Sequence, residues 1–127
     1  MFLDTSVIIE MMLGDDDERM ERILNHIRSE LLFISMAQIS EVSDWCWANS
    51  CNVERRIEQL KEIVHLIPLN EDICVEASKI KAAMRKQRIA KFSLMDGLIL
   101  ASSRYIGQTL LTLDTDFRKA EDVIIIK

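Results

Sequence analysis

The chain has 127 residues, of which 49% are hydrophobic and 6% aromatic, with three glycines and one proline. This length and composition are typical of one globular domain spanning residues 1–127, and they exclude a disordered or low-complexity chain. The formal net charge is −5. Nucleic-acid binders are usually basic because neutralising phosphates supplies much of their affinity, so any surface for nucleic acid must be local.

Cysteine and histidine usage limits the kind of metal site that the chain can form. Cys46, Cys51 and Cys74 fit no zinc-ligand spacing, and their odd number argues against a disulfide framework. His26 and His65 have no partner at metal-ligand spacing. A metal would therefore be held by oxygen atoms, which favours magnesium or manganese over zinc.

No apolar segment is long enough to cross a membrane. The apolar residues near the N-terminus are interrupted by Asp4 and Glu10 and have no basic segment before them, so they do not form a signal sequence. We expect a soluble, cytoplasmic protein.

The first third of the chain predicts two strands, each followed by helical sequence. Met1–Asp4 forms a strand, a helix follows from Thr5, and Gly14 ends it. The acidic residues 15–18 favour the first turn of a second helix, whose apolar residues recur at helical spacing up to Ile27. Residues 31–34 then predict a short buried strand.

Three further helices are marked by residues that favour helix starts. Ser35 and Gln38 have the spacing of a capping box at the start of a helix that contains Glu41. Asn52 caps the next helix, and a short apolar strand follows over residues 64–68. Asn70 caps a long amphipathic helix that extends past Met84.

The last third predicts a central helix and two strands. Ser93 and Asp96 repeat the cap-and-acid spacing before a helix that is apolar on most sides and ends at Gly107. A strand over 109–113, a helical turn over 116–120 and a strand over 123–126 follow. Short apolar strands alternating with helices indicate an α/β fold with a parallel sheet covered on both faces.

Four carboxylates are predicted to meet at one edge of this sheet. Asp4 and Asp114 each end a strand, and the carboxyl ends of parallel strands share an edge, where α/β proteins form their sites. Glu41 and Asp96 lie in the first two turns of helices that begin at that edge. Clustered acids repel one another unless a cation joins them, and magnesium binds carboxylates while leaving positions for phosphate oxygens. The pattern therefore favours phosphodiester hydrolysis.

Each acid also has an ordinary structural interpretation. Asp96 alone could be a helix-start acid, and Asp114 or Asp116 alone could be a turn or cap residue. Glu41 alone, beside Val42, would usually be a surface residue. The hypothesis of a site rests on the joint placement of the four acids.

The ordered motifs resemble those of PIN-domain nucleases, in particular the VapC-type toxins of VapBC toxin–antitoxin pairs. The matching segments cover essentially the whole chain and are Leu3-Asp4-Thr5-Ser6, Ser40-Glu41-Val42, Leu94-Met95-Asp96 and Thr112-Leu113-Asp114-Thr115-Asp116-Phe117.

The resemblance implies a three-layer α/β/α fold with a central parallel sheet and Mg²⁺- or Mn²⁺-dependent cleavage of RNA. It also implies a homodimer and an antitoxin protein that covers the active site. Asp4, Glu41, Asp96 and Asp114 would be the catalytic and metal-binding acids. Ser6 would orient Asp4 or contact the metal's ligand shell, Thr112 would support the site, and Asp116 would be an outer acid or the cap of the turn at Phe117.

Local patterns suggest surfaces for partners. Basic residues gather before Asp96 and could contact the RNA backbone or form an ordinary solvated helix face; they are Lys79, Lys81, Arg85, Lys86, Arg88 and Lys91. Crowded apolar residues could serve a dimer or antitoxin interface or pack in the core; they are Met11, Met12, Leu13, Trp45 and Trp47.

Two other functions are compatible with this class of fold. A non-catalytic binding or scaffold module would need none of the four acids, yet all four are present. A phosphoryl-accepting receiver domain usually has an acid pair after the first strand and a lysine after a late strand. Asp4 has no adjacent acid, and no lysine follows the strand over 109–113.

Overall fold

Five short parallel strands form one sheet in the order β3-β2-β1-β4-β5. The structure is a computed structural model and describes residues 1–127. The strands are β1 (Phe2–Leu3), β2 (Phe33–Ser35), β3 (His65–Ile67), β4 (Leu110–Thr112) and β5 (Val123–Ile125). β1 is central and pairs with β2 on one side and β4 on the other. The predicted parallel sheet is confirmed.

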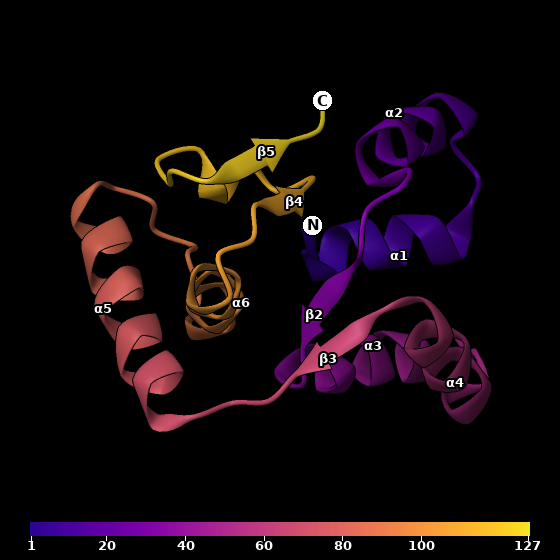
Figure 1. The fold of residues 1–127 in the computed structure, drawn as a ribbon, viewed down its shortest axis with the longest axis horizontal. Helices are drawn as coiled ribbons and strands as arrows, with labels where there is room; N and C mark the ends of the chain where they lie inside the picture. The colour runs from indigo at the N-terminus through magenta and orange to yellow at the C-terminus, as the bar shows by residue number, and fades with distance from the viewer.

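Helices cover both faces of the sheet, which makes the three-layer α/β/α arrangement (Figure 1). They are α1 (Thr5–Leu13), α2 (Asp17–Ile27), α3 (Ala37–Ala48), α4 (Val53–Ile63), α5 (Glu71–Lys86), α6 (Leu94–Tyr105) and the 3₁₀ turn η1 (Thr115–Phe117). Helices α1 to α4 pack on one face, and α5, α6 and η1 pack on the other. None of these helices is long and apolar enough to cross a membrane.

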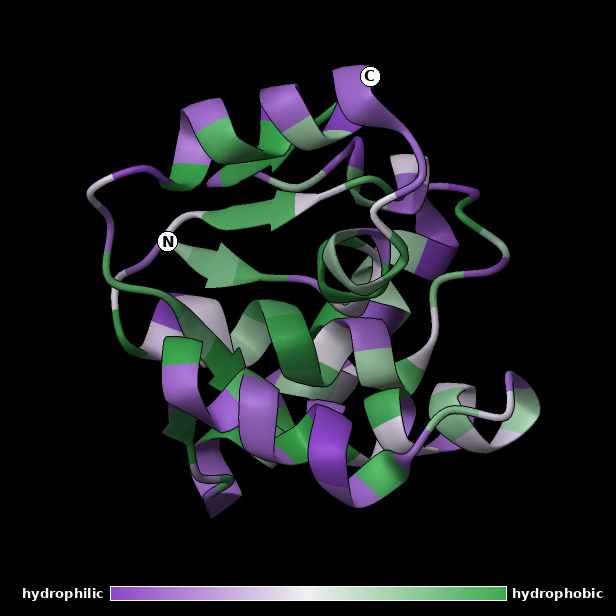
Figure 2. Cartoon of the chain, turned by 90° about the vertical axis from the view of Figure 1, so that its right-hand side faces the viewer, coloured by the Kyte–Doolittle hydropathy of each residue, from purple (hydrophilic) through white to green (hydrophobic).

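Successive residues of the strands alternate between the two hydrophobic layers, as side chains of a β-strand must. Leu3 and Leu111 belong to the core under α1 to α4, whereas Phe2 and Leu110 belong to the core under α5 and α6. The strands are therefore hydrophobic along nearly their whole length, while the outer turns of the helices are hydrophilic (Figure 2). This pattern explains why the strands appear in the sequence as continuous apolar runs.

The predicted helix caps are confirmed where a side chain meets a backbone amide. Asn52 accepts from Arg55 N at 3.0 Å, and Asn70 accepts from Ile73 N at 2.8 Å. Ser93 and Asp96 form a reciprocal capping box. The predicted box at Ser35 is present in shifted form, because Ser35 Oγ accepts from Ala37 N while Ser35 N donates to Gln38 Oε1.

Two predicted boundaries were wrong by a few residues. The strand predicted at 31–34 begins at Phe33 and extends to Ser35, because its ladder with β3 runs from Phe33 to Ser35 and leaves Leu31 67% exposed. The turn predicted at 116–120 is η1, which starts earlier because Asp114 caps it.

The contact between α5 and α6 depends on Gly97. A Cβ atom at Gly97 would lie 2.4 Å from the backbone oxygen of Ala77 on α5. The missing side chain therefore lets the first turn of α6, which includes Asp96, pack directly on the backbone of α5.

Candidate active site

The strand order reverses between β1 and β4. From β1 the chain moves outward through β2 to β3, and it then returns to the other side of β1 to form β4 and β5. In open α/β sheets, such a switch leaves a crevice at the carboxyl ends of the two strands. Asp4 follows β1 directly, and Asp114 lies two residues after β4. The Asp4 N–H donates to Leu111 O at 2.9 Å, which fixes the two strand ends side by side.

Asp4 is buried, with only 4% of its surface exposed, and is oriented by two hydroxyl groups. Ser6 Oγ donates to Asp4 Oδ2 at 2.7 Å, and Thr112 Oγ1 donates to the same oxygen at 2.6 Å. Both hydroxyls thus hold the same oxygen of the carboxylate, and Oδ1 has no side-chain donor.

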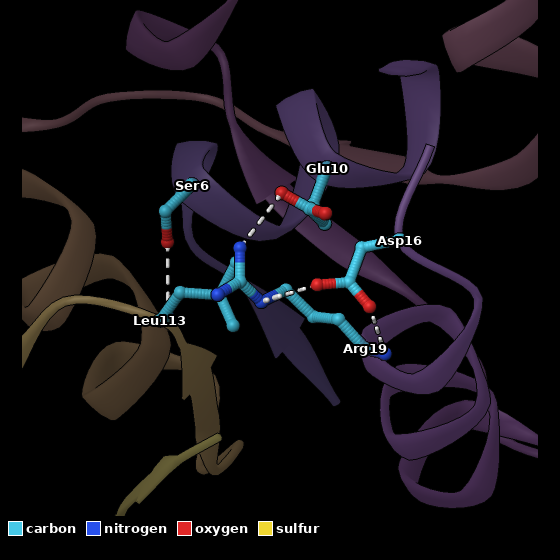
Figure 3. A network of polar contacts seen from close by, with 5 residues as sticks. All are labelled: Ser6, Glu10, Asp16, Arg19 and Leu113. Atoms are coloured by element: carbon cyan, nitrogen blue, oxygen red, sulfur yellow. Dashed lines mark hydrogen bonds and ion pairs between the residues drawn. The ribbon is translucent and has the colours of Figure 1, made fainter. Parts of the chain in front are cut away.

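The same two hydroxyls also fix the loop after β4. Ser6 Oγ accepts from Leu113 N at 3.1 Å (Figure 3), and Thr112 Oγ1 accepts from Asp114 N at 2.9 Å. Each hydroxyl therefore donates to Asp4 and accepts from the chain leading to Asp114. These contacts are consistent with the supporting roles predicted for Ser6 and Thr112.

Glu41 is held by a series of hydrogen bonds that the sequence did not reveal. Thr5 Oγ1 donates to Glu41 Oε1 at 2.5 Å and accepts from Gln38 Nε2 at 3.3 Å. Gln38 is fully buried and also donates to Leu3 O at 2.8 Å. Thr5 lies inside the N-terminal motif, and Gln38 was predicted only as part of a helix cap. The sequence therefore indicated where the two residues lie in their elements but not that they bind Glu41 and Leu3 O.

Asp96 lies in the first turn of α6, where its carboxylate completes the capping box. Its Oδ2 accepts from Ser93 N at 2.8 Å, and its own N–H donates to Ser93 Oγ at 3.0 Å. The helix-start interpretation of Asp96 is therefore confirmed. It is compatible with a role in a site, because an oxygen of Asp96 also lies within 4.8 Å of oxygens of Asp114 and Asp116.

Asp114, not Asp116, caps the turn at Phe117. Asp114 Oδ1 accepts from Asp116 N at 2.8 Å, so the cap role considered for Asp116 was wrong. The Asp116 carboxylate is free of that role, and oxygens of Asp96, Asp114 and Asp116 lie within 4.8 Å of one another.

Three of the four predicted acids have a raised pKa, to which the charges of neighbouring acids contribute. Burial raises the pKa of Asp4, hydrogen bonds from Thr112 and Ser6 lower it, and the charge of Asp114 raises it further, with a net increase. Burial also raises the pKa of Glu41, to which the charges of Asp4 and Asp96 add. Burial raises the pKa of Asp96 as well, to which Asp4 and Asp114 contribute.

The donor set at this edge fits a hard divalent cation. Its ligand atoms are carboxylate oxygens, and one oxygen each of Asp96, Asp114 and Asp116 lie within 4.8 Å of one another. Burial raises the pKa of Asp96, so a nearby positive charge would favour its ionised form. The nearest cation to this cluster in an ion pair is Arg118, whose Nη1 lies 3.9 Å from Asp116 Oδ1. One half-exposed arginine leaves most of the negative charge uncompensated.

The one acidic residue of α1, Glu10, is paired within the protein. Glu10 is only 8% exposed and lies one helical turn after Ser6. Arg19 of α2 contacts Glu10 Oε2 at 3.4 Å and Asp16 Oδ2 at 4.0 Å (Figure 3). Glu10 is therefore excluded from the candidate site, since its charge already has a partner.

The basic residues before Asp96 have different surroundings. Arg85 Nε donates to Phe92 O at 2.9 Å, and Lys79 pairs with Glu76 at 3.9 Å. Lys86, Arg88 and Lys91 are exposed and form no ion pair. Among the apolar residues considered for interfaces, Trp47 is 76% and Leu13 49% exposed, whereas Trp45 packs partly into the core.

Comparison with known proteins identifies the family. A model of the PIN domain matches residues 1–123. The chain belongs to the PIN-domain family. This membership explains the ordered acidic motifs at the switch point.

Individual relatives agree with this assignment. A VapC ribonuclease of Pyrococcus furiosus is 31% identical over 64 residues, which cover 50% of this chain and only 42% of that relative. The solved structure of VapBC-1 from nontypeable Haemophilus influenzae matches with a TM-score of 0.72 and 25% identity over 99% of this PIN domain and 96% of that chain. A toxin–antitoxin complex from Klebsiella pneumoniae shares the fold with a TM-score of 0.75 at 19% identity, over 97% of this chain and 94% of that one.

Proposed function

We propose that this PIN domain is a metal-dependent endoribonuclease that hydrolyses RNA phosphodiester bonds. The main support is the gathering of acidic residues at the switch point, where little positive charge compensates their negative charge. There Asp4, Glu41 and Asp96 have raised pKa values, in part because of one another's charge and that of Asp114. The relationship to a VapC ribonuclease supports RNA as the substrate.

In this proposal Asp4, Asp96 and Asp114 hold Mg²⁺ or Mn²⁺, and Asp116 is an outer acid of the same cluster. The bound ion would polarise a phosphoryl oxygen and lower the pKa of a coordinated water for in-line attack. Ser6 and Thr112 hold Asp4 through Oδ2, so Oδ1 has no hydroxyl donor. Glu41, held by Thr5, orients the attacking water or binds a second ion.

A circular single-stranded RNA tests the proposal, because only an endonuclease can open it. With Mg²⁺ or Mn²⁺ the wild-type protein should convert the circle to linear RNA, and EDTA should stop the reaction. The Asp96→Asn variant should be inactive while keeping its fold. Conversion at the wild-type rate by Asp96→Asn would rule out the assigned site, and the absence of conversion by the wild type would favour the non-catalytic binding module.

We further propose that residues 1–127 form one domain that acts in the cytoplasm as the toxin of a toxin–antitoxin pair. The support is the likeness to chains from VapBC complexes, among them those of Haemophilus influenzae and Rickettsia felis. The test is co-expression with the product of a small open reading frame found beside this gene. That protein should co-purify and suppress RNA cleavage, and a neighbour that does neither would contradict the toxin assignment.

We also propose a homodimer. Trp47, at 76% exposure, and Leu13, at 49%, present apolar surface that a dimer would cover. Light scattering should give twice the mass of 14.7 kDa, and Trp47→Glu should shift the distribution toward monomer if Trp47 lies in the interface. A monomeric wild-type protein would contradict the proposal.

A further inference from the structure

Three helices of this protein end in the same hydrogen-bonded motif, and one of them has an unusual residue in it. In a Schellman motif the residue after the cap adopts a left-handed conformation, which glycine favours. Helix α6 follows this rule, since Gly107 has φ +67° and Gln108 N donates to Ser103 O at 2.9 Å. Helix α3 ends in the same way with the short polar residue Ser50 at φ +56°.

Helix α5 ends in this motif with an arginine. Arg88 has φ +66°, its N–H donates to Arg85 O, and Ile89 N donates to Met84 O, both at 3.1 Å. The other non-glycine residues with positive φ are Ser29, Ser50 and Asp122. Arg88 is thus the only long side chain at a position where glycine would be easier to accommodate. Its exposed side chain forms no hydrogen bond or ion pair within the protein that would explain its presence.

The loop that contains Arg88 is firmly attached to the protein. Ile89 and Phe92 are buried in the core under α5 and α6. Phe92 N donates to Ile89 O at 3.2 Å, and Arg85 Nε donates to Phe92 O at 2.9 Å. The loop therefore holds its exposed side chains in defined positions.

Three cations at the end of α5 and in the loop that follows it are exposed and have no acidic partner. They are Lys86, Arg88 and Lys91, called the basic loop below. Lys91 lies two residues before Ser93, whose N–H donates to Asp96 Oδ2 at 2.8 Å. The basic loop thus leads directly to the acidic site, where an approaching polyanion would otherwise meet only repulsion.

We propose that the basic loop binds the phosphodiester backbone of RNA beside the acidic site, with Arg88 as its main contact. The inference rests on the proposed ribonuclease function and adds the surface that holds the substrate. Arg85 is unsuitable for a test because it also fastens the loop to Phe92.

The test separates binding from cleavage by using the inactive Asp4→Asn variant as background. Binding of a fluorescent 20-nucleotide single-stranded RNA is measured over a range of KCl concentrations. Adding Arg88→Gly should weaken binding about fivefold at 0.1 M salt and reduce the slope of log affinity against log salt by about 0.7, the values for one lost phosphate contact on a single strand. Arg88→Lys should retain most of the binding.

Two controls make the result specific. Arg55→Gln removes one exposed, unpaired arginine from α4, at the opposite end of the molecule (Figure 1), and should leave the slope unchanged. The melting temperature of Arg88→Gly should not fall, since glycine suits the left-handed position. Equal affinities and slopes for Arg88→Gly and Arg55→Gln would overturn the inference, as would an inactive variant that binds no RNA.

The cleavage assay tests the proposed ribonuclease activity separately from RNA binding. If wild-type protein cuts RNA but Arg88→Gly binds as tightly as Arg55→Gln, only the basic loop proposal fails. If RNA binding depends on Arg88 but the wild type never cuts RNA, the basic loop proposal is supported and the nuclease proposal fails.

Discussion

The two sides of the candidate site hold their acids in different ways. On the buried side, Asp4 is oriented by the hydroxyls of Ser6 and Thr112, one residue from α1 and one from β4. On the open side, Asp96 and Asp114 are half-buried. Each is oriented by a hydrogen bond to the backbone at the start of its own helical turn, in α6 and η1 respectively. The buried side therefore depends on tertiary contacts, whereas the open side depends on local backbone geometry.

This difference determines what a substitution removes on each side. Replacing a hydroxyl on the buried side disturbs an acid without removing it. Replacing an acid on the open side with asparagine removes a charge but leaves an oxygen that can still accept the capping hydrogen bond. Substitutions on the two sides should therefore differ in both the size and the kind of their effects.

Asp4→Asn should reduce RNA cleavage by roughly a thousandfold, since several kcal/mol of transition-state stabilisation by a metal would be lost at about 1.36 kcal/mol per factor of ten. Asparagine can still accept from Ser6 and Thr112, so the circular dichroism spectrum and melting temperature should be retained. A variant with more than a tenth of wild-type activity would show that Asp4 is not part of the machinery.

Thr112→Val should lower cleavage by about ten- to a hundredfold, the usual effect of removing a group that orients a metal ligand. The substitution keeps the shape of a buried side chain but takes one of two hydroxyl donors from Asp4. Thr115→Val, on an exposed residue of η1, is the matched control and should have little effect. Equal rates for the two variants would mean that Thr112 does not position Asp4.

Gly97→Ala should destabilise the fold by about 1–3 kcal/mol, because overpacking forces the backbones apart. The added Cβ would meet Ala77 O at 2.4 Å, so α6 would have to move, together with Asp96. Urea denaturation should show a lower midpoint, and cleavage should fall as well. Gly107→Ala is different, because its added Cβ meets nothing within 4 Å and the cost would come only from the left-handed backbone. An unchanged urea midpoint for Gly97→Ala would contradict the close approach of α6 to Ala77 O.

Asp116→Asn should reduce cleavage less than tenfold, whereas Asp114→Asn should reduce it far more. Asp114 caps η1, and its charge raises the pKa of both Asp4 and Asp96. Asp116 lies on the outer side of the cluster, with Arg118 at 3.9 Å. Single-turnover cleavage rates of the two variants measure this difference. A larger loss for Asp116→Asn than for Asp114→Asn would make Asp116 the metal ligand and Asp114 the outer acid.

In EDTA, Asp96→Asn should be more stable than the wild type at neutral pH but not in acid. The folded protein raises the pKa of Asp96 above its ordinary value of 3.8, so the wild-type fold loses stability as the pH rises from 3.8 to that raised value. As the pH falls below 3.8 the carboxyl becomes protonated in both states, and the difference between the variants should shrink. Melting temperatures between pH 3.5 and 8 measure this, and a constant difference would contradict it.

The sequence predicted those features whose cause lies within a few residues. Asn52, Asn70 and Ser93 cap their helices because a short side chain reaches an amide three residues ahead. The parallel sheet followed from the alternation of apolar strands with helices, and the family was indicated by the resemblance of the four ordered motifs to those of PIN-domain nucleases. These local signals located three of the acids at strand ends or helix starts.

Features that depend on distant partners could not be predicted in this way. Nothing near Gln38 in the sequence indicates that its amide meets Leu3 O across 35 positions, and nothing near Thr5 indicates Glu41. Whether Asp114 or Asp116 caps η1 depended on which carboxylate points back to the backbone of that turn. The end of β2 depended on its register with β3.

The central claim is that the acids on both sides bind one divalent cation, and isothermal titration of Mn²⁺ into the metal-free protein tests it most directly. We predict binding to the wild type, at least tenfold weaker binding to Asp114→Asn and to Asp4→Asn, and unchanged binding to Asp17→Asn, an exposed acid in the first turn of α2. Equal affinity in all four proteins, or no binding to the wild type, would contradict it.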